Sequence, residues 1–177
     1  MADKTTLRSP EQYRDPWMAK MVQENEHIGF YNREFYCLDN FSAFQIQYKG
    51  RMYPTVEAAY QAQGFVETAP EVVIVIENAR SAHEAKQIAH ENLDRRCENW
   101  DEIKVRVMEE LLRAKISQHP YVRKKLLETK LCLLVEDSPT DSFWGIGRNN
   151  DGENRLGKLW MKLREEIVNN PGEKEEK

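Results

Sequence analysis

The sequence has few of the residues on which disulfide frameworks and metal sites depend. Its three cysteines, Cys37, Cys97 and Cys132, are scattered and form no CxxC pair, which is typical of free thiols in a reducing compartment. Two of its four histidines, His83 and His90, share one face of a predicted helix. Their spacing corresponds to about 10 Å along the helix axis, too far to share one ion. We therefore predict no metal and no other cofactor.

Long apolar runs and an excess of positive charge are also lacking. No run approaches the roughly 20 apolar residues that a membrane-spanning helix needs, and the N-terminus has no apolar signal segment. We therefore expect a cytoplasmic protein with no membrane partner. The net charge of −4 argues against a broad basic face that coats nucleic acid, although a local phosphate-binding pocket is compatible with it.

A chain of 177 residues suits one domain. Residues 1–24 are polar and show little periodicity, so we predict an N-terminal arm there. Residues 25–168 form the predicted domain, and 169–177 read as a disordered, solvated tail. Whether the arm covers a pocket and which oligomeric state the protein adopts are left open.

The first part of the domain predicts a hairpin followed by helices. Residues 45–54 alternate apolar and polar positions around Lys49-Gly50, which indicates a β-hairpin. Thr55 is placed to cap a helix over the following alanine-rich stretch. Residues 71–79, EVVIVIENA, are ambiguous, because the apolar run reads locally as a buried strand and its flanks read as helix.

The rest of the domain predicts three further helices, one short helix and a strand. Ser81 and Glu84 suggest a capping box, and Asn99 with Glu102 suggests a variant of it. Pro120 ends the clearest helix, which is the one that begins at Asn99. A short helix over 121–128 leads to an apolar strand at 131–136, and the closing helix at 155–168 has Asn154 at its N-cap. These elements predict a mainly helical α+β domain with a small β-sheet.

The loop at 138–154 is unusually long for a compact domain, which is typical of functional or disordered segments. It contains Asp141, Trp144 and glycines that let the backbone approach a ligand or adopt positive φ. Trp144 offers a flat face on which a base can stack. The alternative reading is an aromatic plug surrounded by ordinary turn residues.

Glu57 is the second candidate for chemistry. With Gln61 it lies on one face of a predicted helix whose neighbouring positions are small or apolar. A carboxylate in the first turn is favoured by the helix dipole. A plain charge at a helix start is the alternative reading of the pattern.

Several ordered motifs resemble those of the NADAR (YbiA-like) family. They are LDNFSAF, YPTVEAAYQAQGF, a helix with Trp100, Lys104, Met108 and Lys115 in the family spacing, LLETKLCLLVEDSPTDSFWGIG, and NRLGKLWMKLR. The resemblance covers roughly residues 30–166. It implies a largely helical α+β fold of the YbiA type, in which residues 71–79 are helical, and cleavage of ribosyl N-glycosides.

The resemblance also implies which residues form the site. Glu57 and Asp141 are the catalytic carboxylates, and Trp100 and Trp144 are further core positions. Arg164, with either Arg148 or Lys158, is a candidate for binding phosphate, although surface charge remains the simpler reading of the last two. The supporting pocket residues are Asn40, Phe41, Gln61, Gly145, Gly147 and Asn154.

Cleavage of an N-glycoside builds positive charge on the ribose, so a fixed carboxylate is useful there and a second group must assist water and the leaving nitrogen. We expect Glu57 and Asp141 to share these tasks, in an order that the sequence leaves open. Two positions depart from the family pattern. Ala58 stands where the family often has histidine, and Gly64 stands where it usually has lysine.

Absence of that lysine favours ADP-ribose attached to guanine as substrate, so that the protein removes ADP-ribosylation from nucleic acid. A toxin–antitoxin partner of the ADP-ribosyltransferase type is then left open. The alternative is hydrolysis of ribosylamino-pyrimidine phosphate intermediates of riboflavin biosynthesis, which makes the partner a small phosphorylated molecule. A non-catalytic module that binds NAD or ADP-ribose is the third reading.

Overall fold

The computed structural model describes residues 26–31 and 34–170. The predicted arm at 1–24 and residues 171–177 of the predicted tail lie outside the described residues. Within this part of the chain, no helix combines the length and apolar composition needed to cross a bilayer.

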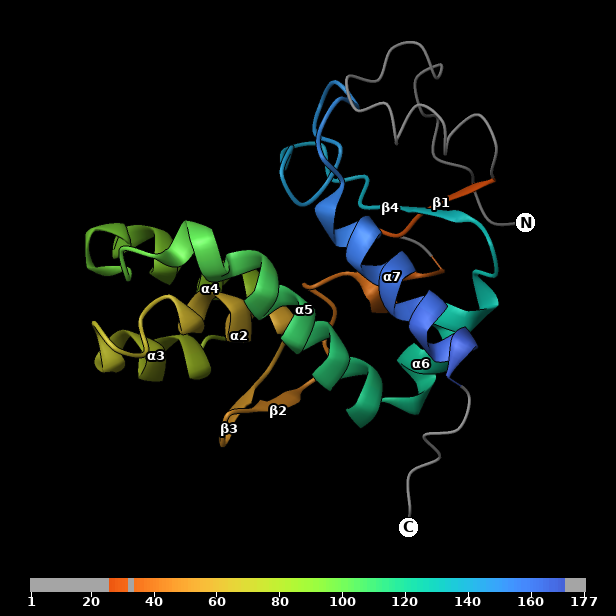
Figure 1. Ribbon diagram of the computed structural model, residues 1–177. Helices are drawn as coiled ribbons and strands as arrows, with labels where there is room; N and C mark the ends of the chain where they lie inside the picture. Colours follow the sequence, from red (N-terminus) through yellow and green to blue (C-terminus); the bar gives the residue numbers. More distant parts are fainter. Residues whose placement is uncertain (1–25, 32–33, 171–177) are drawn as a thin grey trace. The chain divides into compact units, whose positions relative to one another are not determined.

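The described residues form a mainly helical α+β fold (Figure 1), as predicted. The strands form two separate pairs rather than one small sheet. β1 pairs with β4 in parallel, and β2 pairs with β3 in antiparallel. The strands are β1 (His27–Gly29), β2 (Ile46–Tyr48), β3 (Arg51–Tyr53) and β4 (Leu133–Val135), and two 3-10 helices are η2 (Tyr36–Leu38) and η3 (Leu93–Arg95). The α-helices are α2 (Val56–Gln63), α3 (Pro70–Glu77), α4 (Ala82–Glu91), α5 (Trp100–Gln118), α6 (Pro120–Glu128) and α7 (Arg155–Asn169).

The chain divides into two compact units. Unit 2 is the continuous segment Asn40–Arg123, and unit 1 combines the residues up to Asp39 with those from Lys124 onward. Within unit 2, α5 contacts both the β2 strand and helix α2, so the two ends of this continuous segment pack together. Unit 1 is completed only by residues from both ends of the described chain.

Unit 2 begins with the predicted hairpin. Ile46 pairs with Tyr53, and both side chains are fully buried. Lys49 and Gly50 have φ values of 48° and 78°, so both turn residues are in the left-handed region that a two-residue hairpin turn requires. Glycine at the second position adopts this conformation without a steric penalty.

Helix α2 follows the hairpin and packs against α3, α4 and α5. The Thr55 side chain accepts a hydrogen bond from the Ala58 amide at 3.1 Å, which confirms the predicted cap. The strand that the local pattern at 71–79 indicates is wrong, because residues 71–77 belong to helix α3. Val73 and Ile76 are buried while Val75 is half exposed, so burial follows a helical rather than an alternating period, as the family resemblance implies.

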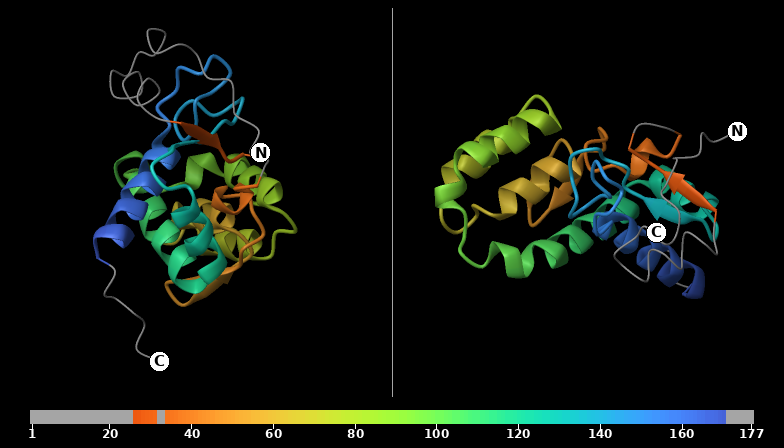
Figure 2. Two further views of the ribbon diagram at one scale, coloured as in Figure 1. Left: turned by 90° about the vertical axis from the view of Figure 1, so that its right-hand side faces the viewer. Right: turned by 90° about the horizontal axis from the view of Figure 1, so that it is seen from above.

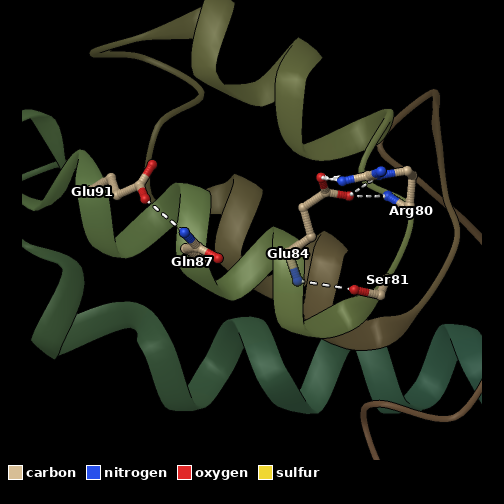
Figure 3. Close-up of polar contacts among 5 residues, drawn as sticks. All are labelled: Arg80, Ser81, Glu84, Gln87 and Glu91. Atoms are coloured by element: carbon tan, nitrogen blue, oxygen red, sulfur yellow. Dashed lines mark hydrogen bonds and ion pairs between the residues drawn. The ribbon is translucent and has the colours of Figure 1, made fainter.

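Helix α4 begins at a capping box that forms only in part (Figure 3). The Ser81 hydroxyl accepts from the Glu84 amide at 3.1 Å, as predicted. The Glu84 carboxylate accepts from the backbone amide and the guanidinium of Arg80, one residue before the cap. This hydrogen bond to Arg80 lowers the pKa of Glu84.

Helix α5 begins without the predicted side-chain cap. Asn99 precedes the helix, but its side chain makes no capping hydrogen bond. Its backbone angles, φ −85° and ψ 13°, are not the extended ones from which a side chain reaches the first free amides. Trp100, Val107 and Leu111, which follow one another at helical spacing, are buried.

Unit 1 is built around the parallel pair β1–β4, with α7 beside it (Figure 2). All three residues of β4 are fully buried. Trp160 of α7 is also fully buried, and its indole nitrogen donates to the Leu38 carbonyl at 2.8 Å. The apolar strand predicted at 131–136 is thus confirmed for Leu133–Val135, which lie in the core of this unit, whereas Leu131 is exposed.

Asn154 is the N-cap residue of α7, as predicted, but its side chain makes no capping hydrogen bond. Its φ of 49° is left-handed, and its buried amide points to the end of β4 instead. Oδ1 accepts from the Glu136 amide at 3.0 Å, and Nδ2 donates to the Leu134 carbonyl at 2.9 Å. Asn154 thus joins the start of α7 to the end of the strand.

We expect Asn154→Ala to lower the free energy of unfolding by about 2–4 kcal/mol, because two buried backbone groups lose their partner and alanine is strained at positive φ. Asn154→Gly removes the strain and should still lose about 1–2 kcal/mol. Urea denaturation measures both, with the exposed Asn169→Ala as control. An Asn154→Gly variant as stable as the wild type would contradict this role.

Candidate functional site

Glu57 occupies the first turn of α2 and is only 5% exposed. Its Oε1 accepts a hydrogen bond from Gln61 Nε2 at 2.8 Å, and its backbone amide donates to the Asn40 carbonyl at 3.1 Å. Burial of a carboxylate is costly unless it is hydrogen-bonded, and the helix N-terminus favours its charge. The structure therefore holds this carboxylate in a fixed orientation, which an ordinary charge at a helix start does not need.

Gln61 joins Glu57 to a residue that the sequence analysis missed. The Gln61 side-chain oxygen accepts from Arg96 Nη2 at 2.9 Å. The Arg96 guanidinium lies 5.3 Å from the Phe65 ring centre and 5.4 Å from that of Trp100. Arg96 follows a 3-10 helix in an irregular segment, so no motif or periodicity in the sequence indicated it.

Burial lowers the pKa of Arg96, and the surrounding acidic groups, Glu57 among them, oppose this shift. A guanidinium keeps its charge in proteins, so Arg96 brings a permanent cation close to Gln61. Its Nε atom is buried and has no hydrogen-bond partner among the described residues.

Other predicted residues lie in the same unit. The Trp100 ring is 5.0 Å from the ring of Tyr60. Asn40 donates from Nδ2 to the sulfur of Met108, while its buried Oδ1 has no partner within the described part of the chain. Phe41 contacts His83 with a ring distance of 4.8 Å. Unit 2 thus contains five of the predicted site residues, which are Asn40, Phe41, Glu57, Gln61 and Trp100.

A cleft of about 440 Å³ opens within unit 2 beside Gln61 and Arg96. Both histidines that the sequence analysis considered as a metal pair line it. In the described residues, no group of three or more histidine, cysteine or acidic side chains is placed to hold a metal ion. The lining residues are Gln61, His83, Lys86, Gln87, His90, Leu93 and Arg96.

Asp141 organises the long loop of unit 1. Its Oδ1 accepts hydrogen bonds from the amides of Phe143 and Trp144 at 2.9 and 2.7 Å, the pattern of an Asx turn. Trp144 is partly exposed, and its ring meets the edge of Phe143 at 5.0 Å. The loop at 138–154 is therefore ordered by its own side chains.

The loop glycines act in two ways. Gly147 has a φ of 65°, as its predicted flexibility allows. A Cβ at Gly145 would lie 2.5 Å from the Glu136 carbonyl oxygen. Close backbone packing within the unit therefore requires glycine at 145, whatever ligand approaches.

The cations predicted to bind phosphate differ in their surroundings. Arg164 is nine-tenths buried, and its Nη1 donates to the Thr129 hydroxyl at 2.6 Å and the Cys132 carbonyl at 2.9 Å. Burial also lowers the pKa of Arg164. These contacts give Arg164 a structural role, and its predicted phosphate contact stays a prediction. Arg148 is exposed and Lys158 is half-buried.

A model of the NADAR domain matches residues 28–168. The chain belongs to the NADAR family. It is 40% identical over 145 residues to the N-glycosidase Npun_R5314 of Nostoc punctiforme, covering 80% of this chain and 93% of that protein. It is 34% identical over 149 residues to the N-glycosidase YbiA of Escherichia coli, covering 83% and 92%.

Two further similarities bear on fold and pathway. The NMR structure of E. coli YbiA matches with a TM-score of 0.75 over 84% of this chain and 89% of that one, at 34% identity. The riboflavin biosynthesis protein PYRR of Zea mays is 37% identical over 160 residues, which are 82% of this chain and 26% of that protein. The predicted YbiA-like fold is confirmed. The NADAR chain is a hydrolase of N-glycosyl compounds. This argues against the hypothesis of a non-catalytic module that binds NAD or ADP-ribose.

The hydrogen bonds of Asp141 predict how amide exchange in the loop changes when this residue is substituted. Asp141→Ala should speed amide hydrogen exchange at Phe143 and Trp144 about tenfold, because both amides lose their acceptor. Asp141→Asn keeps an acceptor oxygen at the same place and should leave exchange close to that of the wild type. Equal exchange in all three proteins would show that the carboxylate does not order the loop.

Proposed function

We propose that this NADAR protein hydrolyses the N-glycosidic bond of a ribosylamino-pyrimidine phosphate, an intermediate of riboflavin biosynthesis. The observation that carries the proposal is the buried Glu57 carboxylate, held by Gln61 in a chain of the N-glycosidase class. The substrate supplies a ribose whose anomeric carbon becomes positive as the base departs.

Glu57 suits the stabilisation of that charge. A buried carboxylate held in one orientation by a hydrogen bond does not have to reorganise when positive charge develops nearby. The same carboxylate can orient the attacking water against the anomeric carbon. Asp141 stays the predicted second carboxylate.

Neighbouring groups of unit 2 suit a ribosylated base. The buried Oδ1 of Asn40 lacks a partner among the described residues, and a ribose hydroxyl that donates to it would remove the cost of that unsatisfied atom. Trp100 and Tyr60 add an aromatic pair to the same unit, and aromatic rings suit a planar base.

The comparisons and the position of Arg96 support this choice of substrate. Riboflavin biosynthesis proteins named PYRR, from maize and Arabidopsis thaliana, are among the relatives. The sequence favoured ADP-ribosyl-guanine because the family lysine is missing at Gly64. A Cβ at Gly64 would lie only 3.0 Å from Arg96 Cγ, so the Arg96 side chain fills this space and the missing lysine opens no extra room. Hydrolysis of ADP-ribosyl-guanine and the existence of a toxin partner stay predictions, and the second assay below compares the two substrates.

We expect Glu57→Gln to lower turnover of the ribosylamino-pyrimidine phosphate by about 10²-fold or more, because the charge is lost while the acceptor for Gln61 is kept. Release of the free base, followed by chromatography, measures it. Circular dichroism checks the fold, and the exposed Glu67→Gln is the matched control.

A parallel assay offers the wild type a DNA oligonucleotide carrying ADP-ribose on guanine. Faster release from this substrate would replace the proposed substrate with the one that the sequence favoured. Full turnover by folded Glu57→Gln on both substrates would refute the catalytic role of Glu57.

A further inference from the structure

We infer that the cleft beside Arg96 is the phosphate-binding site of this enzyme, with Arg96 and Lys86 as its cations. Only the identity of the phosphorylated substrate rests on the proposed function. Binding of phosphate is a property of the cleft itself and is measurable without turnover.

The lining of the cleft has the chemistry of an anion site. Lys86 and Arg96 carry positive charge, and His83 and His90 offer imidazole N–H donors. No carboxylate is among the lining residues that the structure describes. Glu91 is nearby on α4, but one of its oxygens accepts from Gln87 Nε2 at 2.9 Å (Figure 3). Although the net charge of the chain is −4, the lining of the cleft therefore combines two cationic side chains with several hydrogen-bond donors.

The spacing along α4 explains why these donors meet. His83, Lys86, Gln87 and His90 follow one another at three- and four-residue steps, so they share a face of the helix. His83 and His90 are seven residues apart, which is too far for both to bind one metal ion. A phosphate group has four oxygens, so its donors can bind different atoms, and the flexible Lys86 side chain can reach one of these oxygens. The pattern that excludes a metal pair is therefore compatible with an anion.

Arg96 is held in place for such a ligand. Gln61 fixes Nη2, while the rings of Phe65 and Trp100 flank the guanidinium. Nε is buried without a partner in the described residues. An unsatisfied buried donor is costly, and a phosphate oxygen bound at the Nε edge would satisfy it in the bidentate geometry typical of arginine.

Gln61 links this site to the catalytic carboxylate. Its amide nitrogen donates to Glu57, and its amide oxygen accepts from Arg96. One side chain thus sets the position of both groups, which suits a substrate whose phosphate and anomeric carbon belong to the same ribose.

Gly64 allows Arg96 to adopt this position. A Cβ there would lie 3.0 Å from Arg96 Cγ and 3.1 Å from Nε, so we expect Gly64→Ala to shift the arginine side chain by a few tenths of an ångström without removing its charge. The backbone of Gly64 has φ −68°, which alanine adopts readily.

The test uses the imidazole NMR signals of His83 and His90, assigned with His83→Gln and His90→Gln. In phosphate-free buffer the full chain is titrated with inorganic phosphate, with ribose 5-phosphate and with ribose. We expect both signals to shift with the two phosphates and not with ribose. Arg96→Gln should weaken ribose 5-phosphate binding about tenfold or more, and Gly64→Ala should weaken it as well.

Arg95→Gln is the matched control, because Arg95 pairs with Glu71 and does not line the cleft. Loss of affinity in this variant equal to that in Arg96→Gln would overturn the inference, since binding would then reflect general charge. Absence of shifts at both histidines, or unchanged affinity in folded Arg96→Gln, would overturn it too.

Kinetics separate this inference from the proposed function. Lys86→Gln should raise KM with kcat nearly unchanged, as expected for a group that binds ground state and transition state alike. Phosphate-dependent shifts without turnover of the ribosylamino-pyrimidine phosphate would refute the proposed substrate and support the cleft. Turnover of this substrate without phosphate-dependent shifts would support the proposed substrate and refute phosphate binding in the cleft.

Discussion

The buried carboxylate of Glu57 is the constraint on which the arrangement of unit 2 depends. Removing a charged carboxylate from water costs several kcal/mol unless hydrogen bonds replace the lost solvation. The first turn of α2 meets this need with its free N-terminal dipole, and Gln61 supplies a donor one turn later. The carbonyl of Asn40 in turn accepts from the Glu57 amide. Preorganisation of this kind lowers stability locally and is typical of groups that face developing charge.

Gln61 extends this constraint to Arg96. Its side-chain amide can satisfy Glu57 and Arg96 together only in one orientation, with nitrogen toward the carboxylate and oxygen toward the guanidinium. The aromatic rings of Phe65 and Trp100 restrict the arginine further. A cation from outside α2 thereby lies beside Gln61, the hydrogen-bond partner of the glutamate.

Unit 1 shows how family motifs serve structure as well as chemistry. Asp141 closes a turn with its own loop amides, Gly145 packs against a backbone oxygen, and Asn154 joins α7 to β4. Motif residues with these roles are expected wherever a loop must hold one shape without regular secondary structure. Arg164 belongs to the same group, since its guanidinium bonds to Thr129 and Cys132.

The sequence by itself determined what depends on neighbours along the chain. The Lys49-Gly50 turn, the Thr55 cap and the motifs that identify the NADAR family are local patterns with local physical causes. Tertiary structure decided the remainder. Residues 71–77 are helical because packing overrides their β propensity. Asn99 and Asn154 stand at the N-caps of α5 and α7, but their backbone angles keep their side chains from making the capping hydrogen bond. Arg96 reaches Gln61 from 35 residues away, and a contact at that separation depends on packing that periodicity does not encode.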